Sequence, residues 1–287
     1  MESRKNRVRR VLVTGCDGGI GRMAAERLAG RGWEVFAACL TADGCRGLEE
    51  RAGIHPIQLD LRSDSSIADA METVSRQSGG ELHGLVNNAG IAAYGPAEWV
   101  PTDRYEAAMR VNFLGPVAVT QAALPLIRKG QGRIVFVTSA ARFHSLPYMS
   151  AYTASKRAAD SYATAARREL RQWGILVSIV EPGLMRTGMT EPGPIMEQLE
   201  TMHGDLPAEV RELYGPAFLQ RRRERTASMR ERTGDPVRVV GAIRHALSAE
   251  RPRLRYTVGG DAWLARALQW LPESVLDRIF SRIFPHG

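Results

Sequence analysis

The sequence predicts an α/β protein whose doubly wound parallel sheet carries helices on both faces. Short apolar runs alternate with longer amphipathic stretches along most of the chain, and a glycine-rich turn follows the first apolar run. Polar residues recur where the later apolar runs end. Because repeated strand–helix units favour a parallel sheet, here of about seven strands, those polar residues are expected to meet at one edge of it.

The first strand is expected at residues 10–13, and the loop Thr-Gly-Cys-Asp-Gly-Gly-Ile-Gly at residues 14–21 follows it directly. A helical pattern then runs to Gly30. Glycines allow a backbone to approach a pyrophosphate closely, and the first turn of a helix offers free N–H groups. The spacing is G-x-x-x-G-x-G and not the general G-x-G-x-x-G, so a ligand-free glycine loop is the alternative. The flanking strand and helix favour a dinucleotide phosphate site.

The remaining elements follow in alternation. Further strands are expected at residues 34–39, 56–60, 84–87, 133–138 and 176–180. Helices are expected at residues 63–77, 103–114 with a continuation through 117–127, and 152–173. The polar or turn residues that follow the strands are Gly15, Asp60, Asn88, Ser139 and Pro182. Open parallel sheets bind ligands at the carboxyl ends of their strands, so this edge is the predicted site.

Tyr152 and Lys156 stand four residues apart on the last of these helices, and Ser139 lies thirteen residues upstream. Residues four apart project from one helix face. A phenol titrates near ~10, and an ammonium beside it favours the phenolate and lowers that pKa. The chain has 39 basic residues, but lysine occurs only at positions 5, 129 and 156. Y-x-x-x-K also arises on ordinary solvated helices; together with Ser139, it predicts proton transfer to or from an alcohol or carbonyl.

Composition fits a single domain. The 287 residues are 44% hydrophobic, enough for a sizeable core. The sequence contains no run of eighteen apolar residues, so no transmembrane helix is predicted. The first ten residues are basic but lack the apolar centre of a secretory signal. The three cysteines, Cys16, Cys39 and Cys45, lack metal-binding spacing and suggest reduced thiols. A cytoplasmic protein without a metal site is therefore expected.

A net charge of +8 accompanies arginine-rich stretches at residues 221–225 and 230–232. These stretches are interpreted as a solvated helix. Nucleic-acid binding is not expected, because no recognition motif or aromatic stacking platform accompanies the charge. Peripheral contact with an anionic membrane surface is the more plausible alternative.

These motifs together resemble the short-chain dehydrogenase/reductase family. The resemblance covers residues 9–183 in order and is carried by residues 14–21, 87–90, Asn112, Ser139, Tyr152, Lys156 and Pro182-Gly183 followed by Thr187. Stretches at residues 38–41, 84–90, 177–183, 214–219 and 245–256 are similar to the retinol and 17-beta-hydroxysteroid dehydrogenase branch. The first strand is expected almost at the start of the sequence, so the hydrophobic anchor of many animal members is not expected here.

The resemblance implies one Rossmann-type domain over residues 1–287 and a catalytic set. Tyr152 would be the general acid/base, Lys156 would lower its pKa and bind the nicotinamide ribose, and Ser139 would hold the substrate oxygen. Asn112 would anchor a water in a proton relay, although an Asn there could equally be a polar or capping helix residue. A homodimer or homotetramer built on the helices of Asn112 and Tyr152 is also implied.

The resemblance further implies a nicotinamide dinucleotide as cofactor. The residues that would bind it are Gly15, Asp17, Gly19, Ile20, Gly21, Asp60, Leu61, Asn88, Ala89, Gly90, Tyr152, Lys156, Pro182, Gly183, Met185 and Thr187. Asp60 could instead be a turn residue, and Thr187 a helix cap. The second strand ends in Cys39-Leu40-Thr41, with neither an acid for a ribose hydroxyl nor an Arg for a phosphate. NAD is favoured over NADP, and both remain open.

Residues 188–235 are expected to form a helical substrate lid. Apolar residues there and ahead of Tyr152 suit a bulky hydrophobic alcohol or ketone of retinoid, steroid or polyketide type, unless they are helix core. The substrate-contacting residues expected are Phe143, Tyr148, Met149, Met189 and Tyr214. Residues 261–287 form an amphipathic segment that would cover the sheet, form a dimer contact or lie on a membrane. A dinucleotide sensor or scaffold is the alternative function, but the complete set of Asn112, Ser139, Tyr152 and Lys156 favours an enzyme.

Overall fold

The computed structural model describes residues 8–215 and 217–284. Within them, seven parallel strands form one sheet in the order β3-β2-β1-β4-β5-β6-β7, which confirms the predicted doubly wound architecture. The chain starts in the middle of the sheet, builds one edge, returns to the centre and builds the other. The strands are β1 (Arg9–Thr14), β2 (Trp33–Cys39), β3 (Ile54–Gln58), β4 (Gly84–Asn87), β5 (Arg133–Val137), β6 (Leu176–Pro182) and β7 (Arg255–Val258).

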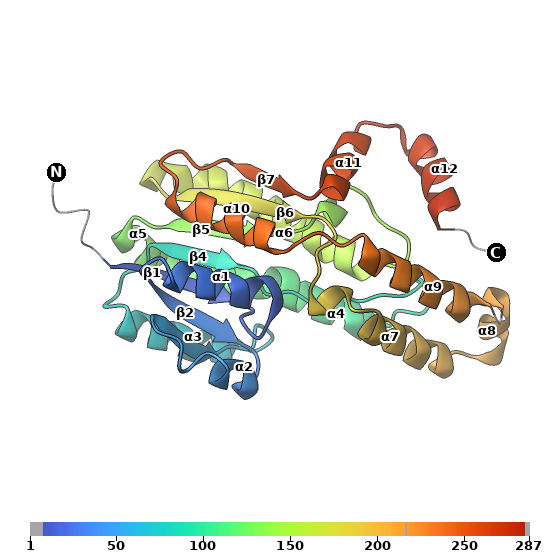
Figure 1. Ribbon diagram of the computed structural model, residues 1–287, viewed down its shortest axis with the longest axis horizontal. Helices are drawn as coiled ribbons and strands as arrows, with labels where there is room; N and C mark the ends of the chain where they lie inside the picture. The colour runs from blue at the N-terminus through green and yellow to red at the C-terminus, as the bar shows by residue number, and fades with distance from the viewer. Residues whose placement is uncertain (1–7, 216, 285–287) are drawn as a thin grey trace.

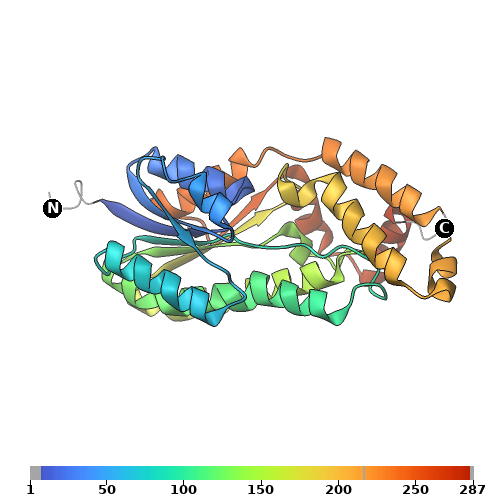
Figure 2. The same cartoon turned by 90° about the horizontal axis from the view of Figure 1, so that it is seen from below.

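Helices cover both faces of the sheet (Figures 1 and 2). On one face lie α1 (Gly19–Ala29) and α10 (Val237–Ser248); on the other lie α3 (Asp64–Gln77), α5 (Gly115–Gly130) and α6 (Ser150–Leu170). Alternate side chains of each strand enter opposite cores, so that Val11 and Val13 pack under α1 while Leu12 packs on the other side. Burial on both faces explains why the strands read as nearly continuous apolar runs.

Two predicted elements differ in detail. The third strand was expected at residues 56–60 but runs over Ile54–Gln58, and its Pro56 is tolerated because β3 is an edge strand. The predicted helix pair at 103–127 is continuous, with α4 (Thr102–Met109) joined to α5 by one π-helical turn, η2 (Arg110–Leu114). Such turns often mark functional positions, and this one holds Asn112.

A helical layer extends beyond the carboxyl ends of the strands (Figure 1). Its helices are α7 (Pro192–Asp205), α8 (Ala208–Tyr214) and α9 (Phe218–Glu231), and α7 and α9 pack side by side. The chain then ends in α11 (Gly260–Leu268) and α12 (Glu273–Ile283); the last residues of the predicted C-terminal segment, 285–287, lie outside the described part. Among the described helices, none is both long and apolar enough to cross a bilayer.

Three short elements follow the carboxyl ends of the strands, where the site lies. The helix α2 (Ala42–Arg46) follows β2, the 3₁₀ turn η3 (Ala140–Arg142) follows β5, and the 3₁₀ turn η5 (Gly188–Thr190) follows β6. A further 3₁₀ turn, η4 (Arg171–Trp173), ends α6 at the opposite edge of the sheet.

Candidate active site

A cavity of about 920 Å³ lies where the carboxyl ends of β1, β4, β5 and β6 face the turn η5 and the helices α9, α11 and α12. It is large enough for a dinucleotide-sized ligand and a second molecule. Most of the residues predicted for the cofactor line it: Gly15, Asp17, Gly19, Ile20, Asp60, Leu61, Asn88, Ala89, Gly90, Tyr152, Pro182, Gly183, Met185 and Thr187. Gly21 and Lys156 lie just behind this lining.

The loop between β1 and α1 can pack only with glycine at two positions. Gly15 has φ +75°, and a Cβ there would come within 2.7 Å of the Ala89 Cα. A Cβ on Gly21 would lie 2.1 Å from the Gly15 carbonyl oxygen. The Asn88 side chain donates to the Thr14 carbonyl at 2.9 Å, which ties β4 to this loop. The resulting backbone cradle opens into the cavity beside the first turn of α1.

Asp17 fastens the end of β2 to the same loop. Its carboxylate accepts hydrogen bonds from the backbone N–H groups of Leu40 and Thr41 at 2.8 and 2.9 Å and from the Thr41 hydroxyl at 2.8 Å. Burial opposes ionisation of this carboxyl, but the hydrogen bonds outweigh it and lower the pKa of Asp17. The carboxylate therefore stays ionised and holds the end of β2 against the loop that precedes α1.

Asp60 lines the cavity but is already engaged. It accepts hydrogen bonds from the Arg62 backbone and side chain between 2.8 and 3.1 Å, and those bonds hold the pKa of Asp60 below its ordinary value. The Asp60 side chain thus acts in the turn after β3, the alternative considered from sequence. Leu61 and Val111 supply apolar surface nearby, and Val111 was not predicted, because a valine before the Asn carries no chemical signal.

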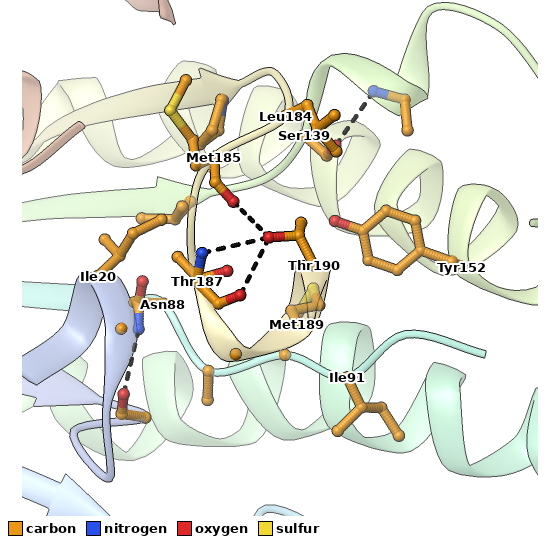
Figure 3. A pocket seen from close by; sticks show the side chains of 18 of the residues that line it. Ile20, Asn88, Ile91, Ser139, Tyr152, Leu184, Met185, Thr187, Met189 and Thr190 are labelled. Atoms are coloured by element: carbon orange, nitrogen blue, oxygen red, sulfur yellow. Dashed lines mark hydrogen bonds between the residues drawn. The ribbon is translucent and has the colours of Figure 1, made fainter. Parts of the chain in front are cut away.

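Ser139 and Tyr152 meet on the opposite wall of the cavity. Ser139 follows β5 and accepts a hydrogen bond from the Ala141 N–H at 3.1 Å, which orients its hydroxyl. Figure 3 shows the Tyr152 hydroxyl directed toward Ser139 and Leu184. Burial raises the pKa of Tyr152, and hydrogen bonding with Ser139 only partly offsets this. The net direction is opposite to the lowering expected from a neighbouring lysine, so the phenol stays protonated at neutral pH.

Lys156 lies behind Tyr152 on α6, with its ammonium nitrogen 5.8 Å from the centre of the phenol ring. Nζ donates to the Val137 carbonyl oxygen at 3.2 Å. Burial lowers the pKa of Lys156 from 10.5 to about 8. A residue with this pKa can carry or release a proton in the ordinary working range of an enzyme.

Asn112 completes the set from the π-helical turn. Its amide donates to the Ile91 carbonyl and the Ser155 hydroxyl, each at 2.9 Å, and its carbonyl accepts from the Ile91 N–H at 2.8 Å. A Cβ on Gly90 would stand 3.1 Å from both the Asn112 carbonyl oxygen and the Lys156 Nζ. The structure therefore brings Asn112 and Lys156 together around Gly90.

The loop after β6 closes the cavity between the two walls (Figure 3). The Thr190 hydroxyl donates to the carbonyls of Met185 and Thr187 at 2.8 and 3.0 Å, and Thr187 also caps η5. Asp261 accepts a hydrogen bond from the Leu184 N–H at 2.6 Å, and a Cβ on Gly183 would lie 2.1 Å from the same carboxylate. The loop is thus held from two directions.

The residues predicted for the substrate divide into two groups. Met149 and Met189 line the cavity, whereas Phe143, Tyr148 and Tyr214 are not part of its described lining. Phe143 packs in a small core with Ala140 and Ala262, and the Tyr214 hydroxyl donates to Glu98 at 3.0 Å. Tyr148 contacts Phe218 and Phe284 with its ring. These aromatic residues support the lining from outside.

Sequence reasoning missed several lining residues, namely Tyr94, His144, Ile283 and Phe284. Tyr94 links two walls, since its N–H donates to Gln198 at 3.1 Å and its hydroxyl to the Met189 carbonyl at 3.3 Å. Isolated aromatic and aliphatic residues in loops carry no sequence pattern. The amphipathic pattern of the C-terminal segment could have signalled Ile283 and Phe284.

The arginine-rich stretch expected to be solvated is only partly so. It forms α9, in which Arg223 lies at the surface, paired with Glu200, whereas Arg222 is only 9% exposed. The guanidinium carbon of Arg222 is 4.2 Å from the centre of the Tyr148 ring. One side of α9 therefore turns cationic side chains inward, which corrects the prediction.

Comparison with known proteins agrees with this geometry. The family model of the short chain dehydrogenases matches residues 9–197. The chain is 37% identical to 17-beta-hydroxysteroid dehydrogenase type 6 of Bos taurus and 35% identical to retinol dehydrogenase 5 of Homo sapiens, covering 96% of this chain and 88% of each relative. A short-chain dehydrogenase from Streptomyces avermitilis superposes with a TM-score of 0.74 at 26% identity, over 97% of this chain and 96% of the other.

One further solved structure has the same fold at lower identity. A short chain dehydrogenase from Burkholderia cenocepacia, solved in complex with NADP, is 23% identical with a TM-score of 0.71, over 95% of this chain and 97% of that one. The chain belongs to the short chain dehydrogenase family. It is an NAD(P)-dependent oxidoreductase of that family, and the glycine cradle at Gly15 and Gly21 fits such a dinucleotide.

Proposed function

We propose that this protein interconverts an alcohol and its ketone or aldehyde on a bulky hydrophobic substrate, with Tyr152 as general acid/base. One observation carries the proposal: Tyr152 and Ser139 meet in the wall of a largely apolar cavity, with the buried Lys156 directly behind the phenol. A substrate oxygen between the two hydroxyls would be within reach of a proton donor and of a second hydrogen bond.

The chain's own residues would supply proton transfer and position. Because burial keeps the Tyr152 phenol protonated, it is poised to donate its proton to a carbonyl oxygen. Ser139 would orient that oxygen. Lys156 would stabilise the phenolate left after donation, and an ammonium with pKa about 8 would do this best below that pH.

Asn112 would connect Lys156 to solvent. Its side chain is fixed by Ile91 and Ser155 and lies beside the Lys156 ammonium around Gly90. A water held there would return the proton that the phenol gives up. We assign Asn112 this role because its three hydrogen bonds hold its side chain beside Lys156, where a bound water could reach both.

The cofactor would lie along the edge of the sheet. Gly15, Gly19, Ile20 and Gly21 would hold its pyrophosphate, residues 60–61 and 88–90 its adenosine half, and Lys156 with residues 182–187 its nicotinamide half. When bound, the nicotinamide supplies the hydride. NAD remains favoured over NADP, since no arginine that could bind a 2′-phosphate stands at the end of β2.

The substrate would occupy the cavity beyond Tyr152, under η5, α9 and α12. We propose that residues 188–235 form its lid and that residues 261–284 form the second cover. Met149, Met189, Leu146 and Phe284 would contact it, and this apolar lining suits the steroid and retinoid compounds named for the relatives.

The test is oxidation of NADH and of NADPH, in parallel, against retinal, steroid ketones and aromatic polyketide ketones. The expected result is turnover of lipophilic carbonyl compounds with a preference for NADH, and no turnover of short-chain ketones of the same reactivity. Turnover of the short ketones alone would contradict the proposed substrate class.

A further inference from the structure

The helix α9 turns a row of arginines toward the outer wall of the cavity. Arg222, Arg225 and Met229 of α9 lie on one side of the helix, and Arg232, directly after the helix, continues that side. Their spacings of three, seven and ten residues from Arg222 return to the same face. Met229 and Arg232 line the cavity. We call Arg222, Arg225 and Arg232 the arginine row.

Aromatic rings connect the arginine row to the cavity. The guanidinium carbon of Arg222 lies 4.2 Å from the centre of the Tyr148 ring, and that of Arg225 lies 4.4 Å from the centre of the Phe284 ring. Phe284 itself lines the cavity, and its ring centre is 6.1 Å from that of Tyr148. The row thus borders the cavity at its α12 end.

Within residues 8–215 and 217–284, no carboxylate forms an ion pair with any member of the row. Other arginines of α9 do have partners: Arg223 pairs with Glu200, and Arg230 with Glu191. Arg222 is nevertheless 9% exposed. A buried guanidinium without a counter-ion is costly, and stacking on a ring offsets only part of that cost. Charge compensation is therefore incomplete on the cavity side of the helix.

The members of the row also disfavour one another's charge. Burial lowers the pKa of Arg222, and the neighbouring Arg225 lowers it further. Burial likewise lowers the pKa of Arg225, with a further contribution from Arg232. An anion placed between them would relieve both effects, because guanidinium groups bind carboxylates through paired hydrogen bonds.

Tyr148 holds the outer end of the row in place. It has φ 66°, a left-handed conformation that is uncommon for a bulky residue. Its carbonyl oxygen accepts a hydrogen bond from the Gly95 N–H at 3.0 Å. Such conformations persist where the surroundings impose them, often at ligand sites. Here the strained residue presents its ring to Arg222, two residues before α6 and its Tyr152.

We propose that the arginine row binds a carboxylate at the far end of an otherwise apolar substrate. The apolar part would lie against Leu146, Ile283 and Phe284, and the reacting carbonyl or alcohol would reach Ser139 and Tyr152. This inference rests on the proposed function and narrows its substrate class to amphiphilic acids. Neutral retinoids and steroids would fill the apolar part and leave the row unpaired.

The test compares a steroid ketone that bears a carboxylate side chain with its methyl ester. For the wild type, kcat/KM for the acid should exceed that for the ester by about tenfold or more, the size of a hydrogen bond to a charged group. Arg222→Gln and Arg225→Gln should each lower kcat/KM for the acid, mainly through KM, by more than they lower it for the ester, and so remove most of this preference. Arg223→Gln, which removes the same charge from the opposite face, should leave the preference intact.

Binding separates failure of this inference from failure of the proposed reaction. Calorimetric titration of the acid and the ester into the protein with NADH present reports affinity without turnover. Tighter binding of the acid that Arg225→Gln abolishes supports the inference even where no turnover occurs. Equal affinity for acid and ester in the wild type, or an unchanged acid preference in both Gln variants, overturns it.

Two controls isolate the contribution of the arginine charge. Arg222→Lys keeps a cationic side chain at this position. Acid binding that is partly restored relative to Arg222→Gln would assign the effect to the charge and not to loss of the fold. Flotation with vesicles with and without phosphatidylserine tests the second source of anions. Vesicle binding that depends on the row, together with no acid preference, overturns the substrate proposal in favour of a lipid surface.

Discussion

The two halves of the cavity are built from different materials. Around Gly15 and Gly21, the backbone itself forms the wall, and there is no room for a Cβ. Beyond Tyr152, side chains from η5, from α9 and from the end of α12 form the wall, including Met189, Met229 and Phe284. A wall made of backbone accepts one ligand shape whatever the side chains are. A wall made of side chains accepts a different ligand when those side chains are substituted. The difference explains how one family can share a cofactor site and differ in substrate.

Loss of Lys156 should have the largest effect and should separate activity from stability. Lys156→Met should lower kcat about 10²- to 10³-fold, because the phenolate loses its buried ammonium. The same variant should be more stable than the wild type: its free energy of unfolding at pH 7 should be higher by on the order of 2 kcal/mol, because burying the charged lysine is unfavourable. Lys129→Met, at an exposed lysine, is the matched control.

The pH dependence of the free energy of unfolding tests whether burial of the charged Lys156 destabilises the fold. The pKa of Lys156 falls from 10.5 unfolded to about 8 folded, so between these values the unfolded state binds more protons. The free energy of unfolding of the wild type should therefore rise with pH across that window, and the rise should be absent in Lys156→Met. Urea unfolding at several pH values measures it; parallel slopes for the two proteins would contradict the assignment.

The backbone wall should tolerate no methyl group at Gly21. Gly21→Ala places a carbon 2.1 Å from the Gly15 carbonyl oxygen, and we expect a loss of about 3 kcal/mol in the free energy of unfolding, with weaker NADH binding. Gly18→Ala, where the added carbon meets nothing within 4 Å, should change stability by no more than about 1 kcal/mol. Similar losses for both would mean that the loop is not packed as described.

Substitutions in the side-chain wall should have smaller effects, and they should change substrate preference. Met189→Ala and Met149→Ala should leave NADH binding unchanged and shift kcat/KM between bulky and small ketones by about tenfold or less. Leu213→Ala, at a residue 79% exposed, is the control and should shift nothing. Steady-state kinetics with a steroid ketone and a short aliphatic ketone measures the shift. An unchanged preference in both Met variants would place the substrate elsewhere.

The same contrast explains what the sequence could predict. The parallel sheet and the backbone wall were predictable, because glycine spacing, alternating strands and the Tyr152–Lys156 pair are local patterns. Val111, Tyr94 and His144 were not, since nothing in their own neighbourhood distinguishes a cavity residue from a core residue. Arg222 was misread as solvated because its burial depends on Tyr148, which lies more than seventy residues away in the chain.

The raised pKa of Tyr152 marks another limit. Four-residue spacing predicts that Lys156 stands near the phenol, and it does so at 5.8 Å from the ring centre. The spacing contains no information about burial, which here outweighs the favourable interactions of the phenolate. The pattern identifies the partners, while packing decides the direction of the pKa.

The central claim is that Tyr152 transfers the proton to the substrate, and that NADH binds to the other half of the cavity independently of the Tyr152 hydroxyl. Tyr152→Phe tests it most directly, with NADH affinity from fluorescence titration and ketone-dependent NADH oxidation measured on the same preparation. The account predicts unchanged NADH affinity and a fall of about 10³-fold or more in turnover. Retained turnover would contradict the role of Tyr152. Loss of NADH binding in parallel would contradict the separation of the two halves.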